Sequence, residues 1–168
     1  MRKIIIIFLV GCLFFCSGCS NERGETKETP MPEITQSVVD INEVAIQLYT
    51  IDESTIQSVS ETVFIPKEDE ITAQRIVQEV ITLFSVHAIE IKVDNVVQKD
   101  NILYVSFKEN YAPITGVSPE VEEVILESIS KSLVDNLLDV EKIIFQKESK
   151  AYQSDNLILE EDEVYWWK

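Results

Sequence analysis

The residue types that support catalysis are sparse in this chain of 168 residues. His87 is the only histidine, so a histidine-based metal cluster is excluded, and a serine–histidine–aspartate arrangement would depend on that one residue. A glycine-rich phosphate-binding loop is also missing, because only Gly24 and Gly116 remain after residue 18. We therefore interpret His87 as a solvated loop residue, and we predict that the protein is not an enzyme and needs no cofactor.

Carboxylates are the abundant reactive groups, with 30 acidic residues against 14 basic ones. The acidic runs at 68–70 and 160–163 lack the alternating spacing and the turn glycine of a calcium loop, so we interpret them as solvated surface. Glu90 and Asp94 could form the general acid and base pair of a carboxylate-dependent cell-wall hydrolase, which we keep as an alternative function.

The three cysteines all lie within the first 19 residues. A basic start, MRK, and an apolar run over residues 4–16 are typical of a secretory signal, and the run is shorter than the roughly 20 residues of a spanning helix. The letters SGC at 17–19 resemble the end of the lipobox of bacterial lipoproteins. This resemblance implies that Cys19 carries a diacylglycerol and that residues 1–18 are removed.

Cys12 is an alternative anchor, because LVGC at 9–12 fits the lipobox letters better than CSGC at 16–19. Cleavage before Cys12 would leave only seven apolar residues in the hydrophobic region, and would leave the apolar residues 13–15 in water beside the anchor. The cysteines could also be apolar fillers or a disulfide framework, although none follows residue 19 to staple a domain.

The chain that follows this signal is strongly acidic. After residue 18 there are 12 basic and 30 acidic residues, a formal net charge of −18. Such a surface repels phosphate backbones, which argues against nucleic acid and favours a basic protein as partner, although the same charge also keeps a domain soluble. Residues 20–38 are rich in Glu, Thr, Ser and Pro, a composition that does not support a packed core. We predict a signal at 1–18, a lipidated, disordered tether at 19–38 and one domain at 39–168.

The domain alternates between two periodicities. Alternating apolar residues predict strands near 44–48, 54–65, 89–93, 103–107 and 140–147. Helical spacing appears at 70–84 and at 118–138, where Ser118 is a natural N-cap and Pro119 fits the first helical position. This β-β-α-β-β-α-β order predicts an α+β class: a single small domain in which two helices pack on one face of a mixed sheet.

Two surface features follow from this arrangement. The strands at 44–48 and 103–107 are candidate open edges, where a partner could pair with the sheet. Trp166 and Trp167 face opposite ways if they are extended, so either one caps the core while the other is exposed, or both are buried locally.

The domain resembles the GerMN domain of sporulation and spore germination lipoproteins. The resemblance rests on VAIQLYTIDE, AQRIVQEVITLF, IEIKVDNVVQKDNILYVSFKENYA and VEEVILESISKSLVDNLLDVEKIIFQ, while the glycine usual after the closing strand is absent from QKESKAY. It implies a module lipid-anchored on the extracytoplasmic face of the cell membrane, which contacts an envelope protein and performs no catalysis. A small-ligand or peptide-binding lipoprotein is a further alternative, and the oligomeric state stays open.

Overall fold

The structure, a computed structural model, describes residues 42–168. The elements are β1 (Glu43–Asp52), β2 (Gln57–Pro66), α1 (Ala73–Val86), β3 (Val93–Lys99), β4 (Ile102–Phe107), α2 (Pro119–Asn136), β5 (Lys142–Lys147), β6 (Lys150–Ala151) and β7 (Trp166–Trp167). The predicted order of strands and helices is confirmed, with the two-residue strands β6 and β7 added after it. The α+β class and the single small domain are confirmed as well.

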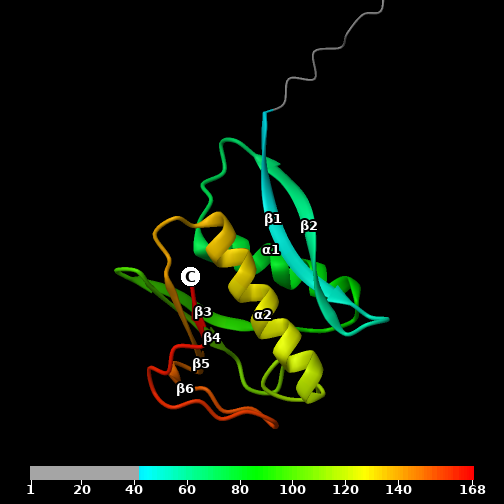
Figure 1. Ribbon diagram of the computed structural model, residues 1–168, viewed down its shortest axis with the longest axis vertical. Coiled ribbons are helices and arrows are strands. Elements are labelled where there is room, and N and C mark those ends of the chain that lie inside the picture. The colour runs from blue at the N-terminus through cyan, green and yellow to red at the C-terminus, as the bar shows by residue number, and fades with distance from the viewer. Residues whose placement is uncertain (1–41) are drawn as a thin grey trace, which may run out of the picture. The chain divides into compact units, whose positions relative to one another are not determined.

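The strands form two sheets, whereas a single mixed sheet was predicted from the sequence. β1 and β2 are an antiparallel pair that bonds only to itself among the described strands. The second sheet is mixed, because β3 and β4 are antiparallel, β4 and β5 are parallel, and β6 and β7 pair with β5 in the antiparallel sense. Figure 1 shows the β1–β2 hairpin alongside α2, with β3 and β4 below it in the view.

Side chains of α2 close the outer edge of β1, and this is why no further strand joins the hairpin there. The backbone N–H of Gln47 donates to Asn136 Oδ1 over 3.1 Å, and Asn136 Nδ2 donates to the Gln47 carbonyl over 2.6 Å. The backbone N–H of Tyr49 donates to Ser132 Oγ over 2.9 Å. Ser132 and Asn136 are four residues apart, so they share one face of the helix.

Of the two strands expected at open edges, 44–48 does lie at the edge of its sheet but α2 covers it, and 103–107 does not lie at an edge. The first lies in β1, whose two edges are bonded to β2 and to α2. The second is β4, which lies between β3 and β5. An alternating pattern shows which face of a strand is buried, but it does not show which neighbours the strand has.

Both helices begin at a capping residue. Thr72 is extended and its side chain accepts the N–H of Arg75, so α1 starts three residues after the predicted start at 70. Ser118 is the N-cap of α2 and Pro119 its first residue, as predicted. At the other end of α2, Lys168 Nζ donates to the carbonyls of Val134 and Leu137, which compensates for the lack of a basic residue in the last turn.

One apolar core joins the two sheets and the two helices. It includes the alternating residues of β1, the inner stripe of α1 and buried residues of α2, together with one face of β4 and β5. The fully buried members with the largest side chains include Leu48, Phe84, Leu103, Phe107, Ile129, Phe145 and Tyr152. Because α2 bonds to the hairpin and also shares this core with the larger sheet, buried residues occur around most of its circumference.

Candidate functional site

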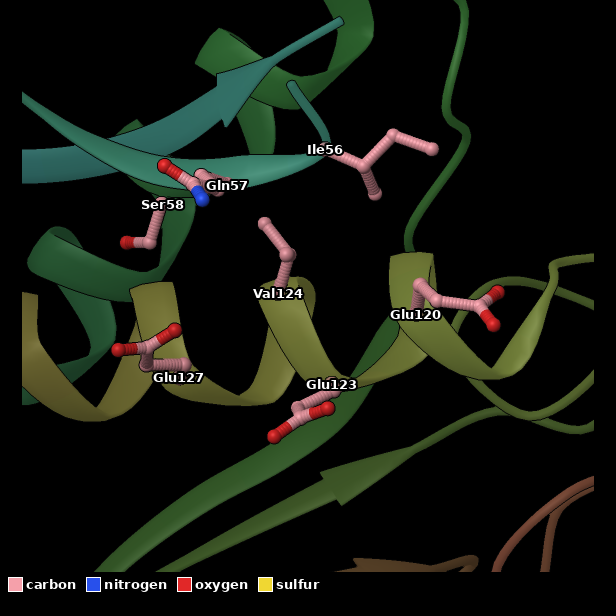
Figure 2. Close-up of a pocket in the computed structure, with 7 residues that line it drawn as sticks. All are labelled: Ile56, Gln57, Ser58, Glu120, Glu123, Val124 and Glu127. Carbon is pink, nitrogen blue, oxygen red and sulfur yellow. The ribbon is translucent and has the colours of Figure 1, made fainter.

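A groove lies between α2 and the start of β2. Its volume is about 390 Å³, and Figure 2 shows the seven side chains that line it. From α2 come Glu120, Glu123, Val124 and Glu127, whose spacing of three and four residues places them on neighbouring positions of one helix face. From the turn before β2 and from its first residues come Ile56, Gln57 and Ser58.

The lining combines an apolar floor with three carboxylates. Val124 is buried at 5% exposure and points from α2 toward β2, while Ile56 is 42% exposed. Ser58 Oγ lies 3.0 Å from Ser128 Oγ, which holds the start of β2 against the helix at the end of the groove. A ligand that fills this groove would therefore contact both the strand and the helix.

The groove carries negative charge at neutral pH. Hydrogen bonds from its own backbone N–H and from the Ser118 side chain hold the pKa of Glu120 below its usual range. Burial, followed by the charges of Glu123 and Glu127, raises the pKa of Tyr165 to about 12. Glu127 pairs with Lys131, whose Nζ lies 2.5 Å from its carboxylate. Within residues 42–168 this is the one ion pair that Glu120, Glu123 and Glu127 make.

The outer edge of β2 is open beside this groove. Gln47 and Tyr49 turn their N–H groups away from β2 and toward α2, and their opposite residues on β2 are Thr62 and Ser60. In an antiparallel pair, two opposite residues either both direct their backbone N–H and C=O groups toward each other or both direct them away. Because Gln47 and Tyr49 direct their groups away from β2, Ser60 and Thr62 direct theirs away from β1. Among the described residues none hydrogen-bonds those outward groups.

A second polar cluster is centred on Glu122, which is only 1% exposed. Its Oε1 accepts hydrogen bonds from Tyr152 Oη and Ser154 Oγ, both over 2.6 Å, and its Oε2 accepts one from Asn156 Nδ2 over 2.9 Å. These bonds fasten the segment after β6 to the first turns of α2. A hollow of about 290 Å³ lies over the cluster, between Pro119 and Tyr165.

Stability should fall when the pH rises above about 10, because of two tyrosines near Glu122. Burial, and after it the hydrogen bond to Glu122, raises the pKa of Tyr152 far above its usual range, and the pKa of Tyr165 is raised to about 12. Above the ordinary tyrosine pKa of 10.0, the unfolded chain releases protons that the folded chain keeps. The free energy of unfolding then decreases with pH, by up to about 1.4 kcal/mol per pH unit for Tyr152 and by less for the more exposed Tyr165.

Urea unfolding at about pH 8 and about pH 11, followed by circular dichroism, measures this effect on either side of the ordinary tyrosine pKa. Tyr165→Phe should reduce the loss between the two pH values, since the variant has no proton to retain at that position. Equal stability at both pH values would contradict the prediction.

The structure places Glu90 and Asp94, the predicted hydrolase pair, in different surroundings. Glu90 is exposed and pairs with Lys92 over 2.9 Å, at the rim of a hollow of about 310 Å³ beside Gly116. Asp94 lies exposed in β3 and does not line that hollow. His87 is the C-cap residue that follows α1, its Nδ1 lies 2.9 Å from Glu53 Oε1, and its side chain is partly exposed.

Each of the two acidic runs contains a glutamate whose side chain accepts a hydrogen bond. In the run at 68–70, Glu68 accepts a hydrogen bond from Asn42, and in the run at 160–163, Glu163 accepts the backbone N–H of Glu160.

Trp166 packs against the core, whereas Trp167 is 63% exposed with Lys142 Nζ 4.5 Å from its ring centroid. The first of the two tryptophan alternatives is thus the observed one.

Cys12 and Cys19, the signal at 1–18 and the tether at 19–38 all lie outside the described residues. Neither helix of residues 42–168 has the length and the apolar character that crossing a membrane requires. The same part of the chain holds no group of three His, Cys, Asp or Glu side chains arranged to bind a metal ion.

Burial of Glu122 was not predicted, although the sequence carries a signal for it. Glu122 precedes Ile125 by three residues and Ile129 by seven, which places it on the apolar stripe of α2. Three glutamates near a helix N-terminus are also explained by the helix dipole, and that explanation holds for exposed Glu120 and Glu123 but not for Glu122.

No protein-family model matches the sequence, and no curated protein matches it. Two solved structures are similar to this chain. One is the crystal structure of a "Putative Lipoprotein from Clostridium perfringens", with 19% identity and a TM-score of 0.47 over 75% of this chain and 89% of the other. The other is the tandem GerMN domains of the sporulation protein GerM from Bacillus subtilis, with 17% identity and a TM-score of 0.49 over 73% of this chain. The match spans 46% of that tandem chain.

Proposed function

We propose that this protein is a lipoprotein of the cell envelope, anchored through Cys19 to the outer face of the cell membrane, whose domain binds another protein. Residues 19–38 act as the tether between membrane and domain. The module is GerMN-like and serves sporulation or spore germination, in line with the sequence segments that resemble that family. It performs no catalysis and uses no cofactor.

The observation that carries the binding function is the open edge of β2 beside the groove. A strand edge presents main-chain donors and acceptors to solvent, and folded proteins usually cover or interrupt such edges. Here α2 closes the edge of β1 and leaves the edge of β2 accessible, which supports a surface used for protein contacts.

The anchor is tested by comparing Cys19→Ala with Cys12→Ala in the full-length protein, produced in a bacterium that processes lipoproteins. We expect Cys19→Ala to abolish palmitate incorporation and to move most of the protein out of the membrane fraction, because two acyl chains are what hold it there. Cys12→Ala should keep both properties. Label that persists in Cys19→Ala but disappears from Cys12→Ala would move the anchor to Cys12, and label in both variants would contradict a cysteine anchor.

The binding function is tested by cross-linking the lipidated protein in its native membranes and identifying the cross-linked chain by mass spectrometry. A protein cross-linked to the described domain supports the proposal. Hydrolysis of purified peptidoglycan by the wild type that Glu90→Gln or Asp94→Asn abolishes would replace it with the hydrolase function.

A further inference from the structure

We propose that the open edge of β2 binds an extended segment of a basic protein as an added strand, with Lys or Arg side chains of that segment paired to the glutamates of the groove. This inference rests on the proposed protein-binding function and names the chemistry of the partner. It combines a main-chain interaction, which gives affinity, with a charge pattern that selects the partner.

The edge of β2 is long and has few of the features that protect edge strands. β2 has 10 residues, at the upper end of the usual range of strand lengths, in which about five or six is the commonest. Its only charged residue is Glu61, it contains no lysine, and its single proline is the last residue, Pro66. Lysines, bulges, prolines and short length are the usual protections against pairing. The strand also exposes two apolar side chains, with Val59 at 39% and Phe64 at 59%.

The charges of the groove determine which kind of segment fits. Glu120 and Glu123 form no ion pair with any described cation, and Glu127 shares only Lys131. The domain that carries them is itself strongly acidic, so an acidic segment would be repelled and a basic one attracted. A neutral segment would leave Glu120 and Glu123 without cationic partners at the contact.

The spacing of the glutamates matches an extended segment. Glu123 and Glu127 are four residues apart on α2, which is about 6 Å along the helix axis at 1.5 Å per residue. Alternate side chains of an extended chain point to the same side and lie about 6.7 Å apart. A segment with Lys or Arg at every second position, lying in the groove along α2, therefore places one cation near each of these carboxylates.

A second copy of this chain is a less favourable occupant. Two identical edges would bring two strongly acidic domains together, and only salt would screen their repulsion, over a Debye length of about 8 Å at physiological ionic strength. Pairing β2 with β2 would also leave Glu120 and Glu123 without cations. We therefore favour a basic segment of another protein.

The test uses the full-length lipidated protein in detergent micelles and a synthetic ten-residue peptide in which lysine alternates with threonine and valine. Binding is measured by fluorescence anisotropy. Two control peptides are compared, one with glutamate in place of lysine and one with the alternate backbone nitrogens methylated, which keeps the charge but removes the N–H donors. We expect both controls to bind at least about tenfold more weakly, which corresponds to about 1.4 kcal/mol.

Matched variants of the protein separate the two parts of the interaction. Ser60→Pro removes an outward N–H without removing a bond to β1, and should weaken binding about tenfold or more. The double variant Glu123→Gln and Glu127→Gln should weaken binding about tenfold and reduce its salt dependence. Glu70→Gln makes a similar change at an exposed site away from the groove and should change the Kd by less than about twofold.

Hydrogen exchange supplies a measurement that does not depend on the folding of Ser60→Pro. In the wild type, the bound peptide should slow exchange at the amides of Ser60 and Thr62. Equal binding of the methylated peptide, or no added protection on β2, would overturn the inference. Self-association of the wild type that Ser60→Pro removes would make a second copy the occupant, which also overturns it. A partner cross-linked elsewhere on the domain would leave the proposed function standing and refute only this inference.

Discussion

Replacing Glu122 by alanine is expected to lower the free energy of unfolding by about 2–4 kcal/mol, because buried hydrogen-bond donors that lose their acceptor cost about 1–3 kcal/mol each. The carboxylate accepts hydrogen bonds from Tyr152, Ser154 and Asn156, and it is 1% exposed. Its removal leaves the buried hydroxyl of Tyr152 without an acceptor and opens a cavity at the start of α2. Urea unfolding at neutral pH, followed by circular dichroism, measures the change.

Glu123→Ala is the matched control for this prediction. It removes the same functional group from the next residue of the same helix, but Glu123 is exposed and lies on the rim of the groove. We expect it to change stability by less than about 0.5 kcal/mol, as exposed substitutions usually do. Similar losses in both variants would show that the charge near the helix N-terminus matters and that the buried bonds of Glu122 do not.

Leu133→Ala is expected to destabilise the domain by about 2.7–5 kcal/mol, the range seen when a fully buried leucine is truncated. Leu133 has 0% exposure and belongs to the core that joins the hairpin, both helices and the larger sheet. Its neighbour Ser132 bonds to β1, so a shift of the helix into the cavity would also disturb the closure of that strand edge. The measurement is again urea unfolding of the wild type and the variant.

Leu138→Ala provides the comparison, since Leu138 lies five residues further along the chain and is 90% exposed. Its truncation should leave the unfolding midpoint nearly unchanged. If the two leucines gave equal effects, α2 would not be packed as the structure describes.

α2 combines structural and binding roles on different faces. Ser132 and Asn136 close the edge of β1, while Glu120, Glu123 and Glu127 line the groove beside β2. The stability variants Glu122→Ala and Leu133→Ala change inward-facing positions of α2, whereas the binding variants Glu123→Gln and Glu127→Gln change outward-facing ones. Loss of binding without loss of stability is therefore a meaningful result for the groove.

The sequence by itself determined the order and the type of the elements. Alternation in β1 and the helical stripes of α1 and α2 are local patterns, because side chains repeat every two residues in a strand and every 3.6 in a helix. Ser118 and Pro119 also determined the start of α2 through local capping. These features depend on neighbours a few residues away, so the local sequence is sufficient to determine them.

The candidate site was predictable only in part. The acidic character and the preference for a basic partner follow from composition, and the α2 glutamates are visible at their spacing. That Glu122 points inward while Glu120 and Glu123 point outward depends on the donors Tyr152, Ser154 and Asn156. Those donors are about 30 residues away, and no local pattern connects them to the helix.

Only the tertiary structure decided which edge of the β1–β2 hairpin is open. Alternation assigned faces to β1 and β4 but could not assign their neighbours, so both were expected at open edges when both are closed. The edge of β1 is closed by Asn136, 89 residues away from Gln47. Strand edges are completed by whichever donors and acceptors the folded chain brings beside them. That contact is non-local, and in the hairpin it closed the outer edge of β1 and left that of β2 accessible.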